Sequence, residues 1–204
     1  MRTAPTRADR RARTRDELIA AADRRFSADG FHATSLDAVA DEAGYTKGAV
    51  YSNFASKEDL FFAVYERRVE RSLAGTGALL DGAATARAGL ARVGAAAARR
   101  READDGWLAV FFEFWAHVLR HPEHRGRFAQ LHGRVIGQLA GGLERHATET
   151  GATLPIAADR LAMSLLALAT GLGLERLTQP DLDLDGLLHE LSERLIGGTD
   201  GSEV

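Results

Sequence analysis

The strongest constraint on this chain is a pair of short helical patterns separated by a single glycine, Gly44. The first pattern follows Thr34-Ser35-Leu36-Asp37, a Thr-x-x-Asp variant of the capping box, and its apolar residues then recur at helical spacing. Gly44 supplies the left-handed residue that ends a helix and turns the chain toward the next one. Cap, helix and glycine turn together predict the first half of a helix-turn-helix.

The segment from Tyr45 to Phe54 supplies the second half. Thr46 can accept a backbone N–H bond at its start, and Val50 and Phe54 share one face that can anchor it to a core. The other face carries small or hydrogen-bonding residues: Thr46, Lys47, Gly48, Ala49, Ser52 and Asn53. Such a face allows the close backbone approach that a helix makes in the major groove of DNA. Alone it also fits a short surface helix, but a further cap at Ser56-Lys57-Glu58-Asp59 favours the DNA-reading interpretation.

Residues 34–61 (TSLDAVADEAGYTKGAVYSNFASKEDLF) resemble the DNA-binding signature of the TetR family of transcriptional regulators. The resemblance extends upstream to residues 14–22 and 26–31. It implies a homodimer in which residues of about 34–57 touch DNA and a variable C-terminal domain binds a small effector. The sequence departs from the family at Tyr45, where an aliphatic residue is usual, and at Asn53, where histidine is common, so the operator sequence stays open.

We expect residues 46–53 to lie in the major groove, with a surrounding set on the phosphates. The residues expected at base edges are Thr46, Lys47, Gly48 and Ser52, those expected on phosphates are Thr34, Ser35, Tyr51, Asn53 and Lys57, and Tyr45 is expected to pack behind this surface. Lys47 and Lys57 are the only lysines in an arginine-rich chain, which favours a role for a compact ammonium at both positions.

Composition predicts an all-α protein, because no alternating apolar–polar run indicates a strand and prolines number only four. We expect about nine helices: an N-terminal three-helix helix-turn-helix domain over residues 14–56 and a helical ligand-binding and dimerisation domain over 57–197. Within the second domain the helices are expected over 57–80, 84–101, 107–120, 121–150, 155–178 and 183–196. A disordered tail is expected over 198–204.

The chain has no cysteine, no apolar run of transmembrane length and no secretory signal, so we expect a cytoplasmic protein without a membrane partner. The net charge of −3 argues against indiscriminate nucleic-acid binding. Part of the positive charge lies near the N-terminus, where residues 1–15 hold six arginines against Asp9. We expect residues 1–13 to form a basic disordered arm. The arm either lies along DNA or is simply a solvated tail.

An aromatic segment, residues 107–115, is the main candidate for an effector site. Its aromatic residues fall on one helical stripe, which fits a core stripe and equally a cavity lining for a flat or cationic hydrophobic compound. The candidate ligand-binding residues are Trp107, Phe111, Glu113, Phe114, Trp115 and His117.

The last two predicted helices carry apolar faces that fit either the monomer core or a four-helix dimer interface of the kind that the resemblance implies. The candidate interface residues are Ala162, Leu165, Ala169, Leu172, Leu187, Leu188, Leu191 and Leu195.

His117, His121 and His124 recur at i, i+4 and i+7, a spacing that fits a metal site, with His132 further on, but Pro122 interrupts the helix between them. We therefore expect no metal and no cofactor. No nucleophile elbow, phosphate loop or catalytic triad pattern is present, so an enzyme is not expected. The remaining alternative is a DNA-binding protein without effector control.

Overall fold

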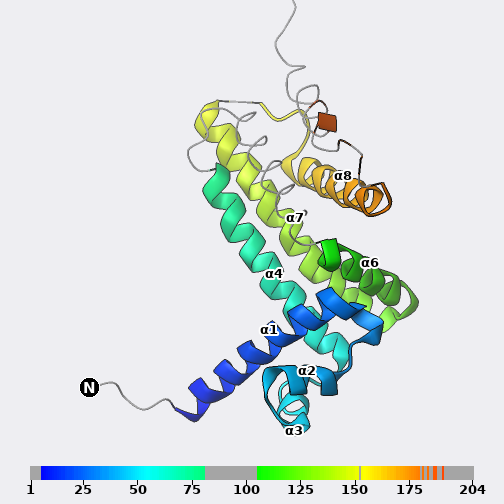
Figure 1. Cartoon of the computed structure of the whole chain (residues 1–204). Helices are drawn as coiled ribbons and strands as arrows, with labels where there is room; N and C mark the ends of the chain where they lie inside the picture. Colours follow the sequence, from blue (N-terminus) through cyan, green and yellow to red (C-terminus); the bar gives the residue numbers. More distant parts are fainter. Residues whose placement is uncertain are drawn as a thin grey trace, which may run out of the picture.

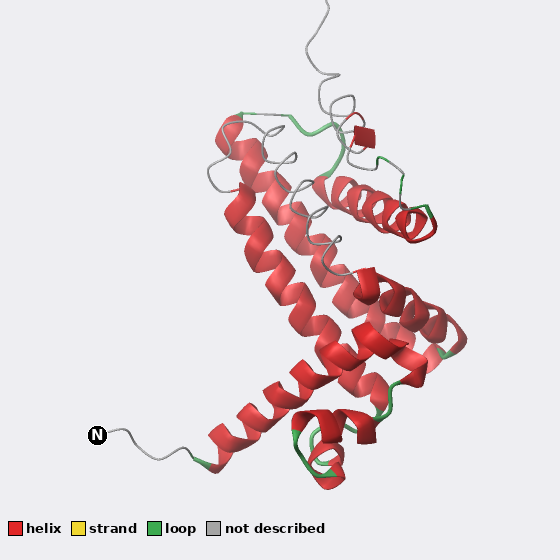
Figure 2. Cartoon of the chain, viewed as in Figure 1, coloured by secondary structure: helices red, strands yellow, loops and turns green. Residues whose placement is uncertain are grey.

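The computed structural model describes residues 6–80, 105–151 and 153–179, with single positions at 181, 183, 186, 187 and 190. Every regular element in these residues is an α-helix (Figure 2), which confirms the all-α prediction. The expected helix over 84–101, most of the helix over 183–196, residues 1–5 and the tail over 198–204 lie outside the described residues.

Helix α1 (Arg7–Ala33) begins much earlier than expected. A capping box starts it: the Asp9 N–H donates to Thr6 Oγ1 at 3.1 Å, and the Thr6 N–H donates to Asp9 Oδ2 at 2.8 Å. Because these bonds satisfy backbone groups that would otherwise be free, a polar segment can hold helical form. The prediction of a disordered arm over 1–13 is therefore wrong for residues 7–13, which form the first turns of α1.

The far end of α1 breaks at Gly30, whose φ of 85° and ψ of 169° place it in a region open essentially to glycine. Thr34 follows the break with its side chain buried, and its hydroxyl donates to the Gly30 carbonyl at 2.8 Å. The cap of α2 (Leu36–Ala43) is Ser35, whose Oγ accepts from the Ala38 N–H at 3.1 Å. The capping role expected of Thr34 thus belongs to the next residue.

The turn at Gly44 has the predicted left-handed form, with a φ of 72°. The Tyr45 N–H donates to the Ala40 carbonyl at 2.9 Å, which closes the end of α2. Helix α3 (Lys47–Tyr51) follows with Thr46 as its cap, and α4 (Lys57–Leu80) begins where Ser56 Oγ accepts from the Asp59 N–H at 3.1 Å. The predicted helix-turn-helix and the cap after it are confirmed.

Three further helices complete the described chain: α6 (Asp105–Arg120), α7 (Pro122–Thr150) and α8 (Ala158–Thr178). Helices α4 and α7 run side by side, α6 packs across α1 and the start of α7, and α8 lies along the far part of α7 (Figure 1). Pro122 opens α7 and Gly151 ends it, as predicted, whereas α8 begins at Ala158, beyond Pro155.

The buried side chains form two separate clusters. The larger one joins α1 to α4, α6 and the first turns of α7, and its centre is Phe114, which stacks on Phe61 with ring centroids 3.9 Å apart. The smaller one joins α7 to α8 through five residues: Ala140, Leu143, Ala158, Leu161 and Ala162. Helix α8 is long and apolar enough to cross a membrane by length and composition alone, with a mean hydropathy of 1.3, and only 17% of its apolar window is buried in this chain.

Candidate nucleic-acid interface

Helix α3 presents one buried and one exposed face. Val50 and Phe54 are buried in the large cluster, as predicted for its anchor. Thr46, Lys47 and Gly48 are exposed on the other face, together with Ser52 and Tyr51, whose side chain is 59% exposed. At Gly48 an added Cβ would meet only Thr46 Oγ1, at 3.8 Å. A partner can therefore approach the backbone closely at this glycine.

Most polar side chains of this surface already bind the backbone of their own helix. Thr46 Oγ1 accepts from the Ala49 N–H at 3.3 Å, and Ser52 Oγ and Asn53 Nδ2 both donate to the Ala49 carbonyl, at 2.9 and 2.8 Å. These bonds fix the ends of a helix of only five residues. Ser52 remains exposed, whereas Asn53 is half-buried.

Lys47 carries the positive charge of the exposed face. Its ammonium donates to the carboxylate of Asp37 on α2, and this hydrogen bond raises the pKa of Lys47. The side chain is 63% exposed, so a phosphate can reach it from solvent. The ion pair ties α3 to α2 while leaving the cation at the surface.

The structure assigns two of the residues expected on phosphates, Lys57 and Thr34, to internal roles. Lys57 Nζ donates to the carbonyls of Phe31 and His32 at 2.8 and 3.1 Å, and burial lowers the pKa of Lys57. The Lys57 side chain therefore joins α4 to the end of α1. It does not point out to the DNA-facing surface, where we expected it. Thr34 is buried, and the Tyr45 hydroxyl donates to Glu17 on α1, which agrees with the packing role expected of Tyr45.

Arginines of α1 lie beside the C-terminal end of α3, a contact that sequence reasoning missed. Arg15 Nη1 donates to the Asn53 carbonyl at 2.8 Å, and its guanidinium lies 4.3 Å from the centre of the Phe54 ring. Arg11 Nη2 reaches the Ser52 carbonyl at 3.4 Å. Cations at a helix C-terminus are favourable, so these side chains orient α3 and add positive charge next to it. The Thr6-x-x-Asp9 capping box was the signal that could have revealed a helix here.

The aromatic stripe of α6 fills the junction with α1 and α4. Phe114 is fully buried, Phe111 nearly so, and Trp107 stacks on Phe61 at 5.2 Å. Glu113 Oε2 accepts from the Phe31 and His32 N–H groups at 2.9 and 3.3 Å. The expected ligand-orienting role of Glu113 is wrong for this arrangement, because its carboxylate closes the broken end of α1.

Trp115 lies on a different side of α6, facing α7. Its ring centroid is 5.3 Å from that of Phe128 and 5.4 Å from that of His132. Tyr65 of α4 completes this group, with its hydroxyl 3.5 Å from His132 Nδ1, and burial raises the pKa of Tyr65 to about 12. The phenol is therefore neutral at physiological pH. Of the six predicted effector residues, Trp115 and Phe111 both meet this second aromatic group, since the Phe111 ring centroid lies 5.3 Å from that of Tyr65 and 6.1 Å from that of Phe128.

The predicted dimer residues divide between core and surface. Ala162 is fully buried against α7 within the single chain, so its assignment to an interface is wrong. Leu165, Ala169 and Leu172 are half-buried, and Leu187 is 39% exposed. Leu188, Leu191 and Leu195 lie outside the described residues. Two apolar side chains that we did not predict, Met163 and Leu174, are 57% and 44% exposed on α8.

The sequence comparisons agree with this geometry. The family model of bacterial regulatory proteins of the tetR family matches residues 18–64, and the model of the C-terminal region of BetI-type transcriptional repressors matches residues 86–196, more than half of the chain. The chain belongs to the TetR family. It is accordingly a helix-turn-helix DNA-binding transcriptional regulator, and α3 stands in the position of the reading helix in that motif.

Individual relatives match this TetR-family chain either over a short segment or at low sequence identity. The transcriptional activator FasR of Mycolicibacterium smegmatis is 39% identical over 61 residues, which are 30% of this chain and 28% of that protein. A TetR transcription regulator of Haloarcula marismortui has the same fold, with a TM-score of 0.74, 17% identity and coverage of 92% and 98% of the two chains. A protein of Saccharomonospora viridis, described as a transcriptional regulator and solved in complex with choline, gives a TM-score of 0.72 at 22% identity, covering 92% and 97%.

Proposed function

We propose that this regulator is a repressor that leaves its operator when a small hydrophobic or aromatic effector binds. The observation that carries the proposal is the exposed face of α3, with Lys47 and Gly48 open to a partner while Val50 anchors the helix. The match of residues 86–196 to BetI-type repressors supports repression. The similarity to the activator FasR supports activation instead. We place its action in the cytoplasm, where operator DNA is found.

A homodimer is part of this proposal. A twofold dimer presents two reading helices to successive turns of the major groove. Helix α8 offers the surface: Met163, Ala167 and Leu174 are exposed and recur at i, i+4 and i+11, which places them on one face. The low burial of this apolar helix within one chain supports its use between two chains. It also favours an interface over the alternative of a monomer whose core is complete.

The effector site that we propose lies among Trp115, Phe128, Tyr65 and His132, where α4, α6 and α7 meet. Aromatic faces bind flat apolar compounds and also organic cations. The choline complex of the Saccharomonospora viridis protein makes quaternary ammonium compounds a reasonable first class to screen. Neutral Tyr65 and His132 would supply hydrogen-bonding groups in an otherwise apolar site.

Switching would act through α4. This helix follows α3 in the chain, and its Lys57 bonds the end of α1. A tilt of α4 therefore moves the reading domain, which consists of α1, α2 and α3. An effector that fits only one tilt changes the spacing of the two reading helices in a dimer. Its differential affinity for the two spacings sets the size of the response.

The test starts from operator footprinting upstream of the gene itself and of its neighbours, followed by a ligand screen for release. Lys47→Ala should weaken operator binding about tenfold or more, because the protein surface that faces DNA loses an exposed cation. Arg145→Ala removes one exposed charge from α7 and serves as the matched control. Equal affinities for the parent and Lys47→Ala would count against this surface. Specific binding that no ligand perturbs would favour a DNA-binding protein without effector control.

Exposed arginines of α1 give a second test of the same surface. Arg7 and Arg10 lie on the part of α1 that precedes Arg11 and its contact with α3. Replacing both by glutamine should weaken operator binding and reduce the slope of log affinity against log salt by about one to two, because each phosphate contact releases about one counterion. An unchanged salt slope would show that this end of α1 stays off the DNA.

A further inference from the structure

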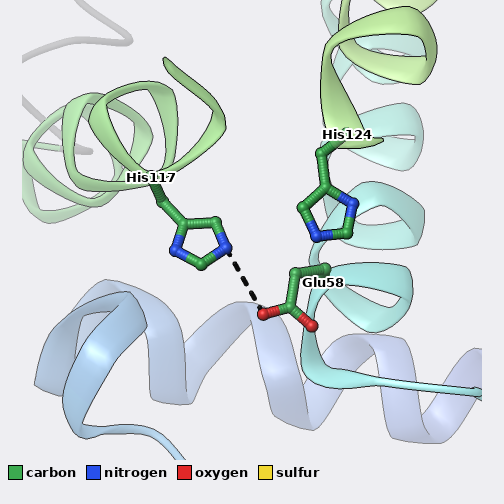
Figure 3. A group of neighbouring side chains, drawn as sticks. All are labelled: Glu58, His117 and His124. Carbon is green, nitrogen blue, oxygen red and sulfur yellow. Dashed lines mark ion pairs between the residues drawn. The ribbon is translucent and has the colours of Figure 1, made fainter. Parts of the chain in front are cut away.

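Three side chains from three helices converge where the reading domain meets the helical domain. Glu58 lies in the first turn of α4, His117 near the end of α6 and His124 in the first turn of α7 (Figure 3). One ligand-type atom of each lies within 4.8 Å of the others, and His117 Nε2 is 3.4 Å from Glu58 Oε1. The break at Pro122 turns α7 back so that His124 returns toward His117, and α4 supplies an acid that sequence spacing could not reveal.

The environment of His117 points to a ligand. Its Nε2 atom is buried and makes no hydrogen bond to any residue that the structure describes. Its side chain is only 13% exposed and that of Glu58 is 21% exposed. Buried polar atoms in folded proteins are almost always satisfied. The Nε2 atom forms an ion pair with the Glu58 carboxylate at 3.4 Å but no hydrogen bond, so a ligand between the two groups would satisfy it.

The donor set suits a divalent transition metal. Two imidazole nitrogens and one carboxylate oxygen are borderline ligands of the kind that zinc binds, and three protein ligands leave a fourth position for water or a small molecule. At zinc–ligand distances of about 2.0–2.2 Å, ligand atoms in a tetrahedral site lie about 3.3–3.6 Å apart. The Glu58–His117 separation of 3.4 Å matches this spacing, and the candidate ligand nitrogen of His124 lies within 4.8 Å of the other two atoms.

His121 is a neighbour of this group and provides the natural control. Its ring lies 4.0 Å from that of His117, but its Nδ1 faces Glu123 at 3.7 Å. It is also more exposed, at 44% of its side chain. The geometry therefore separates two histidines that turn toward Glu58 from one that turns away.

We propose that Glu58, His117 and His124 bind one divalent transition-metal ion of the zinc type. The ion would tie the start of α4 to α6 and α7, so that the orientation of the reading domain depends on metal occupancy. This regulatory consequence rests on the proposed function as an operator-binding protein, whereas metal binding itself does not. The ligands come from three helices, so the bound ion would stabilise their packing against one another.

The first experiment measures metal binding without DNA. Protein purified without a histidine tag and stripped with a chelator is titrated with Zn²⁺ by calorimetry and with Co²⁺ by absorption spectroscopy. We expect one ion per chain, with the d–d spectrum of a low-symmetry four- or five-coordinate Co²⁺ site. Glu58→Gln and His124→Gln should each lower the affinity about 100-fold or more, and His121→Gln should change it less than about threefold.

A thermal measurement guards against variants that fail to fold. At a free Zn²⁺ concentration about 100 times the dissociation constant, the parent should melt about 5–10 °C higher than without metal, and His124→Gln should not shift. Absence of stoichiometric Zn²⁺ and Co²⁺ binding by the parent overturns the site whatever the variants do. Binding that is equal in the parent, Glu58→Gln and His124→Gln overturns it as well.

The regulatory part is tested by measuring operator affinity of the parent and His124→Gln with and without Zn²⁺. A metal-dependent change in the parent alone supports the coupling. Metal binding that leaves operator affinity unchanged keeps the site and rejects the coupling. If no specific DNA binding is found while the metal binds, the proposed function fails and the site stands.

Discussion

The two buried clusters differ in how far a single chain completes them. The cluster around Phe114 and Phe61 draws on α1, α2, α3, α4, α6 and α7, and its largest side chains are fully buried. The cluster between α7 and α8 is small, and the outer face of α8 leaves Met163 and Leu174 in solvent. Among the described residues, the helix-turn-helix end is thus buried by its own chain, whereas apolar side chains on the outer face of α8 remain exposed, which supports the proposed dimer surface.

Polar contacts follow the same division. At the reading end Asp23 of α1 binds Arg68 and Arg71 of α4 at 2.5 and 2.9 Å, so ion pairs cross between helices. On α8 the hydroxyls of Ser164 and Thr170 donate to carbonyls of their own helix at 2.9 and 2.7 Å. Cross-helix bonds fix one relative position, while self-satisfied hydroxyls leave a helix face free to pack against a partner.

The largest effect is expected from emptying the centre of the complete cluster. Phe114→Ala should lower the free energy of unfolding by about 3–5 kcal/mol, because it removes a buried ring and leaves a cavity. Urea denaturation followed by circular dichroism measures it. Met163→Ala, on the exposed face, is the control and should change the monomer by much less. A loss below about 1 kcal/mol for Phe114→Ala would show that this core is not closed.

The next largest effect is expected on the exposed apolar face of α8. Met163→Glu combined with Leu174→Glu places two charges on the exposed face of α8 and should raise the dimer dissociation constant about 100-fold, or about 2.7 kcal/mol. Sedimentation equilibrium measures it. Leu119→Glu adds a charge at an apolar residue that is 59% exposed on α6, and it should leave the dimer intact. A dimer that survives the α8 double variant would place the interface elsewhere.

A smaller effect is expected at the break in α1. Gly30→Ala forces a side chain into a backbone region open essentially to glycine, and its Cβ would lie 2.7 Å from Glu113 Oε1, so we expect a loss of about 2 kcal/mol. Gly126→Ala is the matched control: no atom lies within 4 Å of the added Cβ, and alanine should stabilise α7 by about 0.5–1 kcal/mol. Thermal unfolding of both variants measures the change in melting temperature. Equal changes in the two variants would show that the backbone at Gly30 carries no strain.

The smallest effect is expected at the cap of the reading helix. Thr46→Ala should cost about 0.5–1 kcal/mol, because the Ala49 N–H loses the Thr46 Oγ1 acceptor at 3.3 Å while it keeps the Thr46 carbonyl at 2.9 Å. Thr46→Ser keeps the oxygen and should retain most of the stability. Hydrogen exchange of the α3 amides measures the local effect. Protection that does not change in Thr46→Ala would mean that contacts with α1 alone hold the helix.

Local patterns made the helix-turn-helix predictable. Gly44, the caps and the apolar spacing each act over a few residues, so the sequence determines them directly, and helices α4, α6 and α7 followed from the same kind of signal. The predictions that were wrong concern side chains whose roles depend on contacts between segments far apart in the sequence. Glu113 closes the end of α1 from 81 to 82 positions away, and Lys57 turns inward to carbonyls 25 and 26 positions earlier.

The approach of Glu58 to His117 and His124 belongs to the same class, because it arises only when α4, α6 and α7 pack together. The effector site and the dimer surface were harder still, since an apolar stripe looks the same whether it faces its own core or a partner. Ala162 illustrates this ambiguity: it lies on the expected helix but on the face that packs against α7.

The shortness of α3 has a consequence for how such a regulator can change over evolutionary time. A helix of five residues gains little stability of its own, so its position is set by Val50, by the braces from Arg11 and Arg15 and by the capping oxygen of Thr46. Gly48 and Tyr51 also face outward, and they are not among these supports. If α3 reads DNA as proposed, substitutions at Gly48 or Tyr51 can change the DNA sequence that is bound while the supporting residues stay the same.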